Sequence, residues 1–158
     1  MITTTTMESP VGTLTLTARD GQLTRLHMDG QRHAPAGSPV WERDDAGLAP
    51  VVEQLEAYFA GSRETFEVPL DLAGTDFQRG VWAGLLEIPY GETLSYGELA
   101  RRVGRPGASR AVGLANGRNP VAIIVPCHRV IGANGTMTGY GGGLDRKVWL
   151  LDHERGLR

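Results

Sequence analysis

Two runs near the start of the chain alternate apolar and polar residues with a period of two. They cover residues 12–17 (GTLTLT) and 22–28 (QLTRLHM), and Asp20 and Gly21 lie between them. This alternation is typical of strands with one buried face, and Asp-Gly is a favoured hairpin turn. The sequence therefore predicts a β-hairpin in a half-buried sheet.

The rest of the N-terminal region predicts a small domain around that hairpin. Residues 30–50 are rich in Gly, Pro, Ala and Asp and predict a long irregular connection. Apolar residues at helical spacing predict a helix over 51–59. Residues 66–70 can return to the sheet as an edge strand, where a proline is tolerated. We expect an antiparallel-sheet domain over residues 1–73.

Three short helices are predicted in residues 74–158, the second domain. Thr75 is a plausible N-cap for the first, which ends at Pro89, and Ser95 with Glu98 forms a capping box for the second. The third runs from Ala108 to about 115. The last two have helix-turn-helix spacing, although an ordinary helical hairpin has the same spacing. The predicted fold class is α/β (α+β).

The net charge of −2 conceals an asymmetry between the two halves. Residues 1–73 hold 11 acidic and 5 basic residues, whereas residues 74–158 hold 7 acidic and 11 basic residues. The balances of −6 and +4 suggest an anionic partner for the second half. The third predicted helix offers small residues and one charge, Arg110, so it could read little base sequence but could approach a nucleic-acid backbone closely. A solvated Arg110 is the alternative.

A chain of 158 residues that is 41% hydrophobic can bury a sizeable core, and Cys127 is its only cysteine. It lacks an apolar run long enough to cross a membrane and a recognisable secretory signal. We therefore expect a cytoplasmic protein without an internal disulfide.

The apolar run at 121–125 predicts a buried strand that ends just before Cys127 and His128. A lone cysteine is more often a small buried hydrophobe. A thiol beside a histidine and Arg129 can instead be a nucleophile. Adjacent side chains of a strand point to opposite faces, so a proton path between Cys127 and His128 needs a turn or a water molecule.

Several segments, in order, resemble the O6-alkylguanine-DNA alkyltransferases, the methylated-DNA–protein-cysteine methyltransferases of direct-reversal repair. They are VPCHRV (125–130), IPYGET (88–93), SYGELA (95–100), RAVG (110–113), NGRNP (116–120), GYGGG (139–143) and WLLDHE (149–154). The resemblance implies a ribonuclease H-like N-terminal domain and a winged-helix-like C-terminal domain. It also implies one irreversible transfer of an alkyl group from O6 of guanine to the protein's own cysteine.

The family implies a role for each matching residue. Cys127 would be the nucleophile, His128 the base acting through water, Glu154 the group that orients the histidine, and Asn119 a brace of the turn. Read without the family, Glu154 is a solvated residue at a helix end. The residues implied at the DNA are Tyr96, Arg110, Ala111, Gly113 and Arg129, and those implied at the alkyl pocket are Tyr96, Asn116, Val125, Tyr140, Gly141, Gly142 and Lys147.

The implied partner is alkylated double-stranded DNA, bound through the minor groove with the target base turned out and its space filled by Arg110. No cofactor is expected, and with Cys127, His27 and His33 as the available ligands no metal site is expected either. The expected state is a monomer, with cooperative assembly on DNA and O4-methylthymine repair as open points. The alternatives are a non-catalytic alkyltransferase-like protein, a Cys-His hydrolase and a transcriptional regulator.

Overall fold

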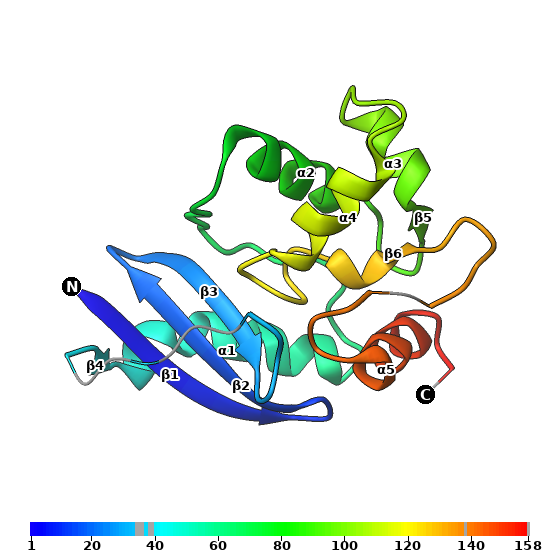
Figure 1. Ribbon diagram of the computed structural model, residues 1–158. Helices are drawn as coiled ribbons and strands as arrows, with labels where there is room; N and C mark the ends of the chain where they lie inside the picture. Colours follow the sequence, from blue (N-terminus) through cyan, green and yellow to red (C-terminus); the bar gives the residue numbers. More distant parts are fainter. Residues whose placement is uncertain (34–36, 38–39, 138, 158) are drawn as a thin grey trace.

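The N-terminal half folds around a four-stranded sheet with the order β3-β2-β1-β4 (Figure 1). The computed structural model describes residues 1–33, 37, 40–137 and 139–157. Strands β1 (Ile2–Ser9), β2 (Gly12–Arg19) and β3 (Gln22–Met28) are antiparallel, and the short β4 (Glu42–Arg43) runs parallel to β1. The predicted hairpin is β2–β3, with Asp20 and Gly21 both at positive φ in its turn.

Helix α1 (Asp45–Phe59) packs against this sheet and begins earlier than predicted. Asp44 caps it by accepting a hydrogen bond from the Gly47 backbone N–H, so the expected irregular connection over 30–50 is wrong from residue 42 onward. The extended segment 66–70 forms a single bridge, Leu23 with Leu70, rather than a full edge strand. The neighbouring residues of the segment do not continue the ladder.

The second half is largely helical. Helices α2 (Asp76–Leu86), α3 (Tyr96–Arg102) and α4 (Ser109–Gly117) pack together beside a small parallel sheet of β5 (Leu94–Ser95) and β6 (Val130–Ile131). Capping boxes start α2 at Thr75 and α3 at Ser95, as the sequence predicts. The last helix is α5 (Leu144–Glu154), at the lower right of Figure 1.

The predicted strand over 121–125 is wrong. All five residues are buried, but the segment turns, with Ile123 at φ 71° and a single bridge from Val121 to Leu26 of β3. The continuous apolar run thus reflects burial on all sides instead of strand geometry. The segment fills the space between the N-terminal sheet and the helices.

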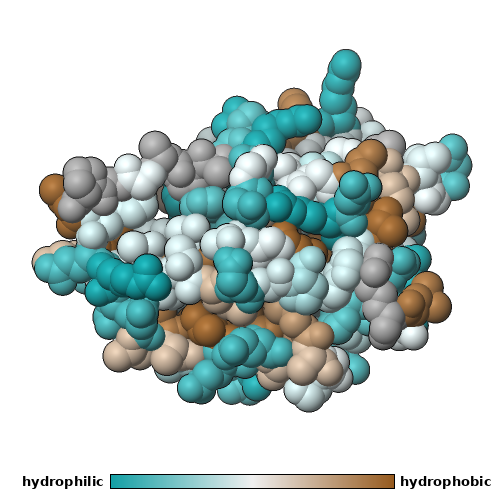
Figure 2. Space-filling model, turned by 90° about the horizontal axis from the view of Figure 1, so that it is seen from below, coloured by the Kyte–Doolittle hydropathy of each residue, from teal (hydrophilic) through white to brown (hydrophobic). Residues whose placement is uncertain are grey.

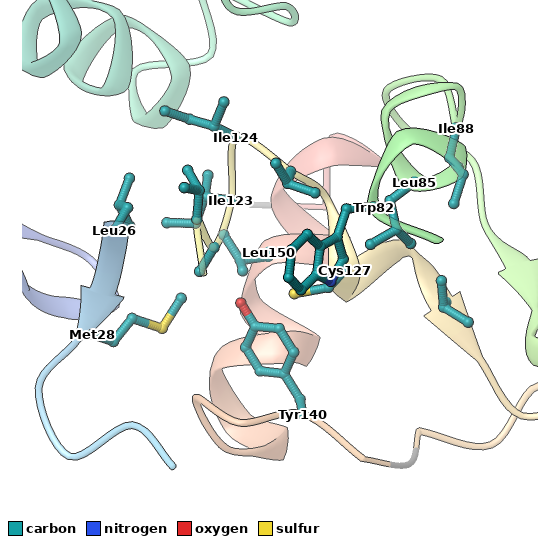
Figure 3. Packing of buried hydrophobic residues seen from close by; sticks show 14 of the residues in the cluster. Leu26, Met28, Trp82, Leu85, Ile88, Ile123, Ile124, Cys127, Tyr140 and Leu150 are labelled. Carbon is teal, nitrogen blue, oxygen red and sulfur yellow. The ribbon is translucent and has the colours of Figure 1, made fainter. Parts of the chain in front are cut away.

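One hydrophobic cluster connects both halves of the chain. In Figure 3, Leu26 and Met28 of β3 face Ile123, while Trp82 and Leu150 approach from the helical half. Figure 2 shows hydrophilic and hydrophobic residues intermixed on the face seen from below. In the described part of the chain, no helix is long and apolar enough to span a membrane.

Candidate active site and DNA-binding groove

Cys127 lies in a tight turn and not at the end of a strand. Residues Cys127–Arg129 form a 3-10 helix, and Cys127 is 6% exposed. Asn119 fixes the approach to this turn, because its Nδ2 donates to Val125 O at 2.8 Å and its Oδ1 accepts from Val121 N at 3.0 Å. Asn116 Nδ2 donates to Cys127 O at 3.3 Å. A proton path between Cys127 and His128 was expected to need a turn or a water molecule, and the structure has the turn. The two side chains are therefore not held on opposite faces of a strand.

Glu154, the last residue of α5, is the centre of a buried network. Its carboxylate lies 2.7 Å from His128 Nε2 and accepts hydrogen bonds from Arg129 Nε (2.8 Å), Arg129 Nη2 (3.0 Å) and Tyr58 Oη (2.6 Å). With 6% exposure it is not a solvated helix-end residue, so that alternative is wrong. Tyr58 comes from α1, and sequence reasoning missed it, because its helical spacing identifies only a core residue.

Burial, hydrogen bonds and charge together decide the protonation states in this network. Burial alone would raise the pKa of Glu154, but hydrogen bonds from His128 and Arg129 and the positive charge of Arg129 lower it. Burial lowers the pKa of His128, an effect that outweighs the opposing hydrogen bond and charge of Glu154. A carboxylate therefore faces a neutral imidazole. The Nε2 atom of this imidazole keeps its proton and donates a hydrogen bond to Glu154. The lone pair is therefore on Nδ1.

The thiol itself is held in its protonated form at rest. Burial raises the pKa of Cys127, while a hydrogen bond from Asn119 and the charge of Lys147 partly offset that effect. Lys147 is fully buried on α5 with its Nζ donating to Val130 O at 2.6 Å, and burial lowers its pKa to about 8. Reaction at the sulfur thus requires a base to take the proton.

Three buried polar atoms near the cysteine have no hydrogen-bond partner in the described part of the chain. They are Asn116 Oδ1, His128 Nδ1 and Tyr140 Oη. Asn116 and Tyr140 line a small cavity of about 10 Å³ together with Cys127 and residues 139–142. In Figure 3 the Tyr140 ring points from its loop into the cluster. Unpaired buried polar atoms are costly, so this group marks a place where a ligand would complete the bonding.

A larger cavity of about 1000 Å³ adjoins this small one and extends along α4. Arg110, Ala111 and Gly113 line it from the helix, and Tyr96 lines it at the start of α3. A Cβ on Gly113 would lie 3.6 Å from the Tyr96 ring, an ordinary van der Waals contact, so Tyr96 and α4 are close neighbours at this wall of the cavity. Leu114 also lines the cavity and is 71% exposed, an apolar contact that sequence reasoning did not single out.

The structure corrects one predicted DNA contact and locates the remaining pocket residues. Arg129 is buried, with its guanidinium bonded to Glu154 and, through Nη1, to Ile88 O at 2.7 Å, so it is not available to DNA. Gly141 lines both cavities and Gly142 the small one. Val125 and Lys147 line neither cavity. The carbonyl of Val125 accepts the hydrogen bond from Asn119 that holds the turn. Lys147 lies behind Tyr96, with its Nζ 6.0 Å from the centroid of the Tyr96 ring.

Family comparisons match both halves of the chain. Residues 2–72 match the ribonuclease-like domain of 6-O-methylguanine DNA methyltransferase, and residues 76–156 match its DNA-binding domain. The N-terminal sheet and the following helical unit agree with the fold that the sequence predicts.

Individual relatives agree with this match along almost the whole length. The methylated-DNA–protein-cysteine methyltransferase of Mycolicibacterium paratuberculosis is 58% identical over 155 residues, which cover 98% of this chain and 93% of the relative. The corresponding protein of Methanosarcina acetivorans is 51% identical, with 93% and 94% covered. The crystal structure of Mycobacterium tuberculosis OGT in complex with DNA superposes with a TM-score of 0.90 at 55% identity, covering 98% and 92%. Both domain models and the near full-length relatives agree, and Cys127 directly precedes the buried His128 and Arg129 of the network, so the protein belongs to the 6-O-methylguanine DNA methyltransferase family.

Proposed function

We propose that this protein repairs DNA by direct reversal, taking the alkyl group from O6 of guanine onto Cys127 in a single, irreversible turnover. The observation that carries the proposal is the cysteine beside three unpaired buried polar atoms, backed by the Glu154 network. The two halves have different roles. Residues 1–73 stabilise the second half, and residues 74–158 bind DNA and carry the reactive cysteine. O4-methylthymine is a second lesion that the same chemistry would serve.

The step begins with removal of the thiol proton. His128 Nδ1 carries a free lone pair and accepts the proton of Cys127, directly or through a water molecule, while Glu154 stabilises the imidazolium that results. The thiolate then attacks the alkyl carbon, so a C–S bond forms as the C–O6 bond breaks. The electron pair of the broken bond stays on guanine.

The leaving guanine needs hydrogen-bond donors. Tyr96, which lines the large cavity, would donate to the purine ring and stabilise the developing negative charge. Asn116 Oδ1 and Tyr140 Oη would gain partners when the base enters, which relieves their unpaired state. The alkyl group itself would lie against Gly141 and Gly142, where the missing side chains leave room.

The target atom lies inside a base stack, so the nucleotide must be turned out of the duplex. We propose that α4 enters the minor groove with its small residues and that Arg110 fills the space that the base leaves. Arg110 is exposed at the first turn of α4, and within the described residues its guanidinium has no ion pair. This arrangement suits repair at any sequence, because it relies on backbone contact and deformation instead of base-edge readout.

The direct test is the intact mass of the protein after mixing with duplex DNA that carries one O6-methylguanine. We expect a gain of one methylene unit located on Cys127, in amounts that never exceed one per protein molecule. The Cys127→Ser variant is the matched control and should bind the same duplex without a mass gain. Tight DNA binding with no change of mass in the wild type would instead indicate a lesion-binding protein without transfer activity.

A further inference from the structure

A third cavity, of about 340 Å³, lies between strand β3 and the C-terminal end of α4 and adjoins the large cavity described above. The N-terminal domain supplies Arg25, His27 and Arg32 to its wall. The helical half supplies Gln78 of α2 and Arg118, the residue that follows α4. The cavity therefore opens at the junction of the two domains.

Its charge is entirely of one sign. Arg25, Arg32 and Arg118 line it, and the described residues of its wall include no aspartate or glutamate. No hydrogen bond or ion pair to a described residue engages any of the three guanidinium groups. The N-terminal 73 residues carry a balance of −6, with five arginines in all, yet two of the five line this cavity. A concentration of unpaired arginines on an acidic domain calls for an anionic ligand.

A second observation points the same way. His27 Nδ1 is buried without a hydrogen-bond partner in the described part of the chain, and His27 lines this cavity beside Arg25. An anion with several oxygens would satisfy the guanidinium groups and, through a protonated or donor nitrogen, the imidazole as well.

The position of this cavity relative to α4 indicates which anion it would bind. Arg32, His33, Gln78, Gly117 and Arg118 line both this cavity and the large cavity along α4, so the two adjoin. Arg110 and Arg118 stand at opposite ends of α4, eight residues or roughly 12 Å apart along the helix axis. That distance equals about three to four steps of one DNA strand, at about 3.4 Å for each step.

We propose that this cleft between the domains, lined by Arg25, Arg32 and Arg118, binds a phosphate of the DNA backbone a few nucleotides from the extruded base. The N-terminal domain then becomes part of the DNA-binding surface. The inference rests on the proposed placement of DNA along α4.

The test is the salt dependence of duplex binding by the double variant Arg25→Gln/Arg32→Gln. Each lost phosphate contact reduces the slope of log Kd against log salt concentration by about 0.9. Because one phosphate contact is lost, we expect the slope to fall by about 0.9, with binding roughly tenfold weaker at low salt. The control is Arg19→Gln/Arg155→Gln, which removes the same charge from residues that line none of the three cavities and should keep the wild-type slope.

The outcomes separate the source of the anion and the two proposals. A double variant with the slope and affinity of the control would overturn the phosphate site. Stabilisation of the wild type, but not of the double variant, by inorganic phosphate, combined with an unchanged slope for DNA, would assign the cleft to a free anion and also overturn it. Both results leave methylation of Cys127 by O6-methylguanine duplex intact, whereas failure of the proposed function removes that methylation in the wild type.

Discussion

His128 Nε2 and Glu154 Oε2 lie 2.7 Å apart in a fully buried contact, and this contact keeps the other imidazole nitrogen free of the proton. The same carboxylate is the counter-charge of Arg129. Both the reactivity of the cysteine and the stability of the turn that holds it therefore depend on one side chain.

The Glu154→Gln variant should lose both properties. We expect alkyl transfer from a free O6-alkylguanine base to slow by roughly 100-fold or more, because the imidazole loses the group that orients it. The unfolding free energy should fall by roughly 3–5 kcal/mol, because Arg129 becomes an uncompensated buried charge. Single-turnover rates and urea denaturation measure the two effects. The exposed Glu87→Gln serves as control, and equal behaviour of the two variants would contradict the role of the network.

Acid should destabilise the protein in two steps. Burial lowers the pKa of His128 below its usual 6.5, so the unfolded chain takes up a proton that the folded chain refuses, and stability falls as the pH drops below about 6.5. The pKa of Glu154 is also lowered from 4.5, so a second loss follows below about pH 4.5. Each proton of difference changes the unfolding free energy by about 1.4 kcal/mol per pH unit.

Denaturation curves measured across the pH range test the two-step loss of stability. Two histidine variants separate the contributions of His128 and His27 to the step below about pH 6.5. Burial and the charge of Arg25 also lower the pKa of His27, so it contributes in the same direction. His128→Asn and His27→Asn should each reduce the slope between pH 6.5 and 5. If both variants keep the wild-type slope, the assignment of this step to buried neutral histidines is wrong.

The hydroxyl of Tyr58 should matter although it belongs to the N-terminal domain. Its hydrogen bond to Glu154 is 2.6 Å long, and the acceptor is charged. Tyr58→Phe should therefore cost roughly 1.5–3 kcal/mol of unfolding free energy. Tyr90→Phe is the matched control, because Tyr90 packs edge-on against Tyr58 without a hydrogen bond to any described residue. Denaturation curves that coincide for the two variants would contradict a structural role for this bond.

Two neighbouring glycines should respond differently to an added methyl group. A Cβ on Gly142 would lie 2.7 Å from Met28 Sδ and 2.8 Å from the Tyr140 ring, whereas on Gly141 it would find only ordinary contacts, the nearest at 3.5 Å. Gly142→Ala should destabilise the fold by roughly 1–3 kcal/mol and slow the transfer. Gly141→Ala should be close to wild type in melting temperature. The reverse order would show that the loop is not packed as described.

Arg110→Ala should separate base extrusion from chemistry. Repair of a duplex lesion should slow much more than reaction with a free O6-alkylguanine base, because only the duplex requires a side chain to fill the vacated stack. Arg155→Ala, which removes the same charge at the end of α5, should leave both rates unchanged. Comparable losses of Arg110→Ala on both substrates would refute the extrusion role.

The sequence predicted those elements whose signals are local. The hairpin turn at Asp20 and Gly21 and the capping boxes at Thr75 and Ser95 all appear where the residue chemistry placed them. The run at 121–125 was misinterpreted because a segment buried on every side lacks the periodicity that separates a strand from a packed turn. The early start of α1 was missed because its Gly and Pro residues are more common in loops.

The site was predictable only as far as the motifs extend along the chain. The sequence placed Cys127 next to His128, but the 3-10 turn that contains both residues is held by hydrogen bonds from Asn119 and Asn116. The family resemblance implied a DNA contact for Arg129, but the structure buries its guanidinium against Glu154. Its burial follows from Glu154, 25 positions later, a pairing that no local pattern reveals.

The carboxylate of Glu154 joins three stretches of chain that are far apart in sequence: α1, the turn at Cys127 and the end of α5. During synthesis on the ribosome these stretches emerge at different times, and the last of them completes the set. A nascent or partly unfolded copy then carries His128 without the Glu154 carboxylate that fixes the position of the imidazole proton. The thiol of Cys127 therefore becomes reactive only once folding is complete.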